Sequence, residues 1–185
     1  MNKFISVFVF LVMLYVPLST QAQTDKLEIV KVDGTLVENA SELLYYNFGS
    51  TSKKMFTDSL LVRNISNETL SIKVRKNEVS IVDGTFNTFT ALSQVVPVSE
   101  SITPNLWDLA PNETLPVNAY FQGTYFIQNQ FGTSTFLYSF LTLNEQEEVI
   151  DSVYLVCHFM KNSVSPLGYD DEVFVNKEFL VTGDP

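Results

Sequence analysis

The sequence predicts an all-β protein, built as a sandwich of two antiparallel sheets with about seven to nine strands. The first indication is the strict alternation after residue 70, which places Leu70, Ile72 and Val74 on one face and polar residues on the other. A period of two is typical of a half-buried strand. The second is that turn pairs such as Asp33-Gly34 and Asp83-Gly84 separate short apolar runs. The third is that few segments show helical periodicity.

The best-defined element is Leu60–Lys76, in which two apolar alternations flank an Asn-rich turn. This pattern predicts an antiparallel hairpin whose turn is shaped by Asn and Ser side chains. Other runs rich in β-branched and aromatic residues predict further strands. In chain order these are Leu27–Val32, Leu43–Phe48, Val79–Val82, Phe86–Ala91, Leu115–Phe121, Phe136–Leu143 and Val149–Phe159. Phe136–Leu143 is apolar on both faces, which indicates a central strand.

Two segments interpreted as irregular loops are the candidate functional loops: Ser93–Thr114, which shows no alternation, and the Gly-bounded segment Gly123–Gly132. Long irregular stretches are uncommon in compact domains and are often functional. The binding residues predicted in them are aromatic: Trp107, Tyr125, Phe126 and Phe131. Loop aromatics can anchor a protein partner. Two alternatives stay open: that Trp107, Tyr125 and Phe131 stack on a glycan, and that Trp107 folds back to plug an open end of the sandwich.

The N-terminus predicts export from the cytoplasm. Lys3 precedes an almost wholly apolar run, Phe4–Tyr15, and Pro17 and a small-residue site ending at Ala22 follow it. This order is typical of a signal peptide, and the run is shorter than the about 20 apolar residues of a spanning helix. We therefore expect a signal peptide at 1–22, a sandwich domain at 23–161 and a C-terminal tail at 162–185. The tail is expected to add an edge strand or to be partly disordered, and no membrane span is expected after cleavage.

The charge of the chain excludes several classes of partner. With 21 acidic and 11 basic residues, the formal net charge is −10. Such a surface repels phosphate backbones and anionic membranes, so nucleic-acid binding is not expected.

Residues for catalysis or metal binding are sparse. The chain has one cysteine, Cys157, and one histidine, His158. Neighbours in a strand point to opposite faces, so these two cannot form a nucleophile–base pair. Cys157 is expected to be a small buried hydrophobe, although an intermolecular disulfide stays open. The acidic runs at 145–148 and 170–172 match no calcium loop and are interpreted as solvated turns. We expect no catalytic residues, no metal site and no cofactor.

Short motifs add a resemblance. Arg63–Leu70 is similar to a turn of bacterial Ig-like domains of the ASPM–SPD-2–hydin type, and Leu109–Thr114 resembles the step into a following strand of those domains. More narrowly, Leu60–Phe159 resembles small exported Ig-like modules of Gram-negative bacteria that use type IX secretion. The resemblance implies an Ig-like sandwich that acts as an interaction or structural module, with no catalytic residues.

These observations predict a non-catalytic module, periplasmic or at the cell surface, that binds a protein partner. A glycan-binding module using the loop aromatics is the alternative. A pilus or surface-assembly subunit is a further alternative; as a pilus subunit the chain would need a missing strand that a partner supplies.

Overall fold

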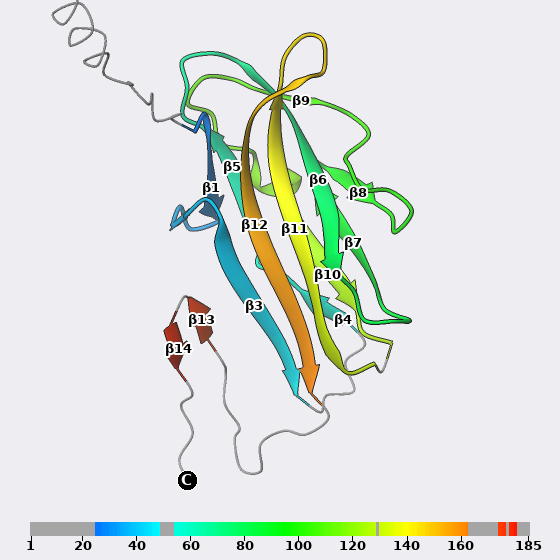
Figure 1. The fold of residues 1–185 in the computed structure, drawn as a ribbon. Coiled ribbons are helices and arrows are strands. Elements are labelled where there is room, and N and C mark those ends of the chain that lie inside the picture. The colour runs from blue at the N-terminus through cyan, green and yellow to red at the C-terminus, as the bar shows by residue number, and fades with distance from the viewer. Residues whose placement is uncertain (1–24, 49–53, 129, 163–173, 177, 181–185) are drawn as a thin grey trace, which may run out of the picture.

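Two β-layers pack face to face in this protein (Figure 1). The computed structural model describes residues 25–48, 54–128, 130–162, 174–176 and 178–180. The expected signal peptide lies outside the described residues. Eight of the described strands have five or more residues, in agreement with the predicted strand number.

The front layer in Figure 1 is a five-stranded sheet. Its strands, in spatial order, are β3 (Ser41–Phe48), β12 (Val149–Asn162), β11 (Gly132–Leu143), β6 (Leu70–Ser80) and β9 (Trp107–Leu109). β11 pairs antiparallel with β12 and β6, so it is the central strand that its apolar sequence predicts. β3 is the exception, because it runs parallel to the second half of β12, from Leu155 onward.

The second layer combines two smaller sheets. One has the order β4 (Lys54–Phe56), β10 (Gln122–Phe126), β7 (Phe86–Ala91) and β8 (Gln94–Val96). The other has the order β2 (Leu36–Val37), β1 (Leu27–Lys31) and β5 (Leu60–Asn64). Leu60 and Phe121 exchange two backbone hydrogen bonds of 2.9 and 2.7 Å, which join the sheets into one layer.

Aromatic side chains fill the space between the layers. Phe121 of the second layer meets Tyr138 of β11 edge-on, with ring centroids 4.7 Å apart. Tyr125 stacks on Phe159 of β12 at 5.1 Å. All four residues are at most 2% exposed. The one cysteine, Cys157, is free and fully buried, so no disulfide contributes to the described domain. Apolar packing therefore stabilises the domain.

A buried polar network crosses the same core. The Lys76 ammonium donates a 2.9 Å hydrogen bond to the backbone oxygen of Asn87 and pairs with Glu78 at 3.3 Å. The Tyr138 hydroxyl donates to Oδ1 of Asn87 at 2.7 Å, and Nδ2 of Asn87 donates to the Thr124 carbonyl at 3.1 Å. These bonds link β6, β7, β10 and β11, so they satisfy buried groups and fix the two layers relative to each other.

The predicted hairpin at Leu60–Lys76 is wrong in its pairing, although both of its strands exist. β5 pairs with β1, whereas β6 pairs with β11 and β9. The turn at 65–69 therefore carries the chain from one layer to the other. Buried Asn64 shapes this crossing, because its Nδ2 donates to the carbonyls of Glu68, Leu109 and Ala110.

Two further details differ from the sequence interpretation. The predicted strand Leu115–Phe121 contains instead a 3₁₀ turn at Val117–Ala119, in which Val117 is exposed. Lys76 continues the inward row of Leu70, Ile72 and Val74 and is buried at 2% exposure. The alternation predicted that Leu70, Ile72 and Val74 face inward. Burial of Lys76 at the end of the same row also requires a hydrogen-bond acceptor, which the Asn87 carbonyl of the other layer supplies.

The tail contains two short strands, β13 (Phe174–Asn176) and β14 (Glu178–Leu180), which form a separate two-stranded sheet. Within the described part of the chain, no helix has the length and apolar character needed to cross a membrane.

Candidate functional site

Tyr125 does not lie in a binding loop, contrary to the prediction. It belongs to β10, which occupies residues 122–126. Its side chain is 2% exposed, and its hydroxyl shares a 2.7 Å hydrogen bond with the Ser134 hydroxyl. A partner cannot reach this residue in the folded domain, so its role is core packing.

Trp107 and Phe131 lie near opposite ends of the five-stranded sheet. Trp107 sits in β9, packs against the core as the plugging alternative expects, and lies opposite Ile72, which in turn faces Thr142. Phe131 is 55% exposed just before Gly132, the other end of β11. A strand rises about 3.3 Å per residue, so roughly 30 Å separates these positions. The aromatics proposed to stack on one glycan therefore do not form a common site.

Phe126 is different, because it belongs to a surface cluster. It lies on the outer face of β10, directly between Lys54 of β4 and Phe86 of β7. In the next row, Thr124 lies between Phe56 and Thr88. We call this surface the aromatic face and define it by Lys54, Phe56, Phe86, Thr88, Thr124 and Phe126.

The geometry of the aromatic face is ordered. The Phe126 and Phe86 rings stack with centroids 4.4 Å apart and an interplanar angle of 15°. The Lys54 ammonium lies over the Phe126 ring, 4.9 Å from its centroid, as in a cation–π contact. Phe56 is 51% exposed. Among the outward-facing side chains described on β4, β10, β7 and β8, Lys54 is the one charged group.

The platform beneath the aromatic face is closely packed. A Cβ atom at Gly123, between Gln122 and Thr124, would lie 2.8 Å from the Tyr138 hydroxyl oxygen and 3.1 Å from Cγ2 of Thr57. The absence of a side chain at this position therefore lets β10 approach β11. Because Asn87 bonds Thr124 and Tyr138 directly below, the outward side chains are held on a rigid sheet.

Sequence reasoning missed Phe56 and Phe86 as partners of Phe126. The signal was present in the alternations Phe86-x-Thr88-x-Thr90 and Gln122-x-Thr124-x-Phe126. Each alternation identifies an outer face, but nothing local says that β4, β10 and β7 are neighbours.

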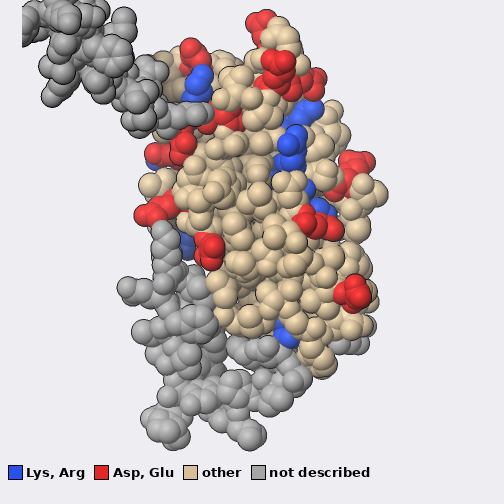
Figure 2. Space-filling view, in the orientation of Figure 1, with Lys and Arg blue, Asp and Glu red and all other residues tan. Residues whose placement is uncertain are grey.

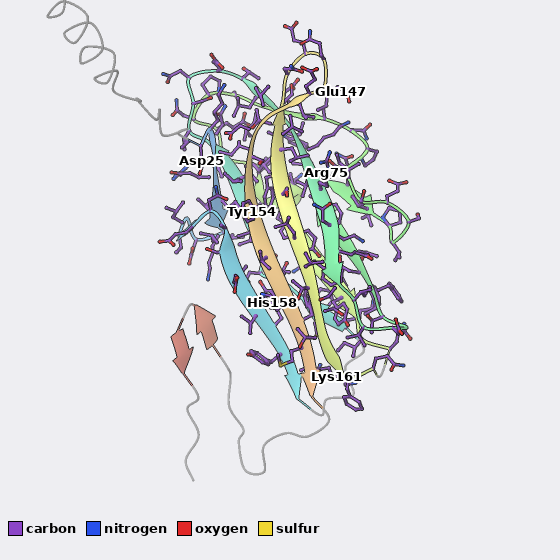
Figure 3. All side chains as sticks on the ribbon, viewed as in Figure 1. Asp25, Arg75, Glu147, Tyr154, His158 and Lys161 are labelled. Atoms are coloured by element: carbon purple, nitrogen blue, oxygen red, sulfur yellow. The ribbon has the colours of Figure 1, made fainter. Side chains whose placement is uncertain are left out.

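The chain's one cysteine and one histidine do not form a catalytic pair. Cys157 is fully buried, whereas the next residue of β12, His158, lies on the outer face of the sheet (Figure 3). The two side chains therefore point to opposite faces, as predicted. His158 lies on the outer face, with Nδ1 3.0 Å from the Thr135 hydroxyl. Burial, reinforced by the charge of Asp58, raises the pKa of the Cys157 thiol far above its ordinary value and opposes formation of the thiolate. The described residues contain no group of three or more His, Cys, Asp or Glu side chains arranged to hold a metal ion.

Comparison with known proteins identifies the fold. No protein-family model and no curated protein sequence matches the chain. Among solved structures, the N-terminal domain of PorA is similar over 75% of this chain and 99% of that domain, with 14% identity and a TM-score of 0.53. The fold is an Ig-like β-sandwich. This likeness extends to the fold alone.

More distant structural similarities have lower scores. The PapD-like domain 7 of human CEP192 matches 77% of this chain and 89% of that domain, with 9% identity and a TM-score of 0.40. The CooA pilin subunit from enterotoxigenic Escherichia coli matches 76% of this chain and 99% of the pilin, with 9% identity and a TM-score of 0.41.

Proposed function

We propose that this chain is a non-catalytic, extracytoplasmic interaction module that binds a protein partner through the aromatic face. The observation that carries the proposal is a sheet face with stacked aromatic rings and one charged side chain, in a protein with a net charge of −10. Interface centres are depleted of charge and enriched in aromatic residues. The partner is therefore a protein that offers a largely uncharged, apolar surface.

The exposure of the aromatic face supports a docking surface rather than a part of the hydrophobic core. Phe56 leaves half of its surface in water, and Phe126 and Phe86 are only half-buried by each other. An apolar cluster of this kind is stabilised when a partner excludes water from it. Because the Phe126 ring already stacks on Phe86 and lies beneath the Lys54 ammonium, these side chains lose little conformational freedom on binding.

The N-terminal sequence supports the extracytoplasmic part of the proposal. The N-terminal run Phe4–Tyr15 and the small-residue site before Gln23 match a cleaved signal peptide. N-terminal sequencing of the protein recovered from cell fractions should begin near Gln23. A chain that retains residues 1–22 in the cytoplasmic fraction would contradict export.

The binding test compares two exposed apolar surfaces of the same protein. Tagged mature protein is cross-linked in its native envelope, and the material recovered with the wild type is compared with that of F56S/F126A. The double variant should lose most of one stoichiometric partner, whereas V79S, at an exposed position of β6 in the other layer, should retain it. Equal recovery by all three proteins, or equal loss from both variants, would contradict the proposal.

A further inference from the structure

A groove opens on the side of the sandwich where β1 and β2 approach β12. Its volume is about 410 Å³, and its floor is made by core residues, among them Leu27, Ile29 and Val153. Leu36 at 54% exposure and Ile65 at 42% stand at its margin. The floor itself is almost fully buried, so Leu36 and Ile65 are the apolar lining side chains that face solvent.

A second hollow continues the groove. It is lined by Val149–Ser152 and by Asp25, which also lines the first groove. Val149 and Ile150 are 47% and 46% exposed. In Figure 3, Asp25 lies at the start of β1, beside the half of β12 that precedes Tyr154. The two hollows thus meet at Asp25 and form one elongated depression, whose second part is more polar than the first.

The charged side chains that line the groove are all acidic. Asp25, Glu28 and Glu38 line the groove, and none of its lining residues is Lys or Arg. Asp151 lines the continuation. Outside the lining, Arg63 forms an ion pair with Glu28, and within it Nδ2 of Asn39 donates a 3.0 Å hydrogen bond to Asp25. Figure 2 shows several acidic side chains, with basic ones among them, along this edge of the molecule, while the centre of the sheet face is mostly uncharged.

The adjacent strand edge is closed to an added strand. The backbone N–H of Tyr154 donates to Oδ1 of Asn39, and its carbonyl accepts from the Ala40 N–H, both at 2.9 Å. The Ser152 N–H donates to Oδ1 of Asp151 at 2.8 Å. Ile150 is an extra residue in the pairing with β11, which is a bulge that interrupts the ladder. Polar caps and bulges of this kind prevent strand pairing at an edge.

We infer that the groove binds a partner segment that carries apolar side chains next to Lys or Arg. The apolar side chains would cover Leu36 and Ile65, and the cations would face Asp25 and Glu38. Recognition by side chains follows from the capped edge of β12, because main-chain addition has no free ladder there. This surface is separate from the aromatic face, so the inference does not depend on the proposed function.

The test uses two matched peptides, one of alternating leucine and lysine and one of alternating leucine and glutamate. Both are titrated into the uniformly ¹⁵N-labelled mature protein. The lysine peptide should shift the amides of Leu36, Asn39 and Ile65 most strongly, and the glutamate peptide should not. Raising NaCl from about 50 to about 500 mM should weaken lysine-peptide binding roughly tenfold, because exposed charges are screened.

Variants of exposed residues test whether the lysine peptide binds in the groove. I65S and L36S should each weaken the lysine peptide at least fivefold, whereas F56S on the aromatic face should leave its affinity within twofold. Shifts spread evenly over the acidic surface, equal binding of both peptides, or equal affinity of I65S and F56S would overturn the inference. So would concentration-dependent shifts at the groove without peptide, because a second copy of the chain would then be its occupant.

Discussion

The aromatic face and the groove are both apolar, but they are built in opposite ways. The aromatic face is the outer side of one four-stranded sheet, with stacked rings and Lys54 as its one described charge. The groove is a gap between the edges of two layers, with Asp25, Glu28 and Glu38 around a floor of core residues. A face with a single charge selects a partner mainly by area and shape, whereas the acid-lined groove selects by charge.

This difference predicts how binding at each surface should depend on salt concentration. Binding at the aromatic face should be insensitive to salt, because no long-range charge attraction contributes to it. Binding at the groove should weaken as salt increases. The following predictions test whether different residues stabilise the two surfaces. They begin with the largest expected effect.

The largest effect separates two sequence neighbours, Tyr125 and Phe126. Y125A should lower the free energy of unfolding by about 3–5 kcal/mol, because it empties a buried aromatic site. F126A should lower it by about 1 kcal/mol, because it removes one half-buried ring of a stacked pair. Urea denaturation measures both values. Equal destabilisation would mean that Phe126 is a core residue and that the aromatic face is not a free surface.

The second prediction concerns the turn that carries Ile65 to the margin of the groove. N64A should lower the free energy of unfolding by about 1–3 kcal/mol, because three backbone carbonyls, that of Leu109 in a buried bond, lose their donor. N67A, in the same turn but exposed, should change it by less than about 0.5 kcal/mol. Thermal or urea unfolding of both variants makes the comparison. A mild N64A phenotype would show that the crossing between layers is held by its backbone alone.

The third prediction concerns the core that both surfaces share. The raised pKa of Cys157 keeps the folded thiol protonated at a pH where the unfolded thiol ionises. The unfolded state then binds fewer protons, so stability should fall as pH rises above about 9, by up to about 1.4 kcal/mol per pH unit for this group. Buried Tyr138 has a raised pKa for the same reason and adds a later decrease.

Urea titrations of the wild type and C157A at several alkaline pH values measure this slope. C157A should show a smaller loss of stability between about pH 9 and 10, whatever its stability at neutral pH. Identical slopes for the two proteins would contradict burial of the thiol in the folded state.

The smallest expected effect is at Lys54. K54Q removes the cation over Phe126 and should lower the free energy of unfolding by about 0.5 kcal/mol. Recovery of the partner in the cross-linking experiment should stay within twofold of the wild type. A large loss of the partner would show that the aromatic face also works by charge, which would remove the contrast with the groove.

Much of the strand content was predictable because alternation is a local property. Leu70, Ile72 and Val74 are buried as their period predicts, and the apolar run around Phe140 is a central strand. Cys157 and His158 fall on opposite faces for the same reason. The site was predictable only at Phe126, and Tyr125 was misplaced because its segment was interpreted as a loop.

The sequence by itself determined which residues share a face of a strand, and therefore the all-β class and most of the inward row of each strand. Only the tertiary structure decided which strands are neighbours. It placed β5 and β6 in different layers, set Lys76 against the Asn87 carbonyl, and brought Phe56, Phe86 and Phe126 together. The physical reason is that side-chain direction depends on adjacent residues, whereas strand pairing depends on contacts between residues far apart in the chain.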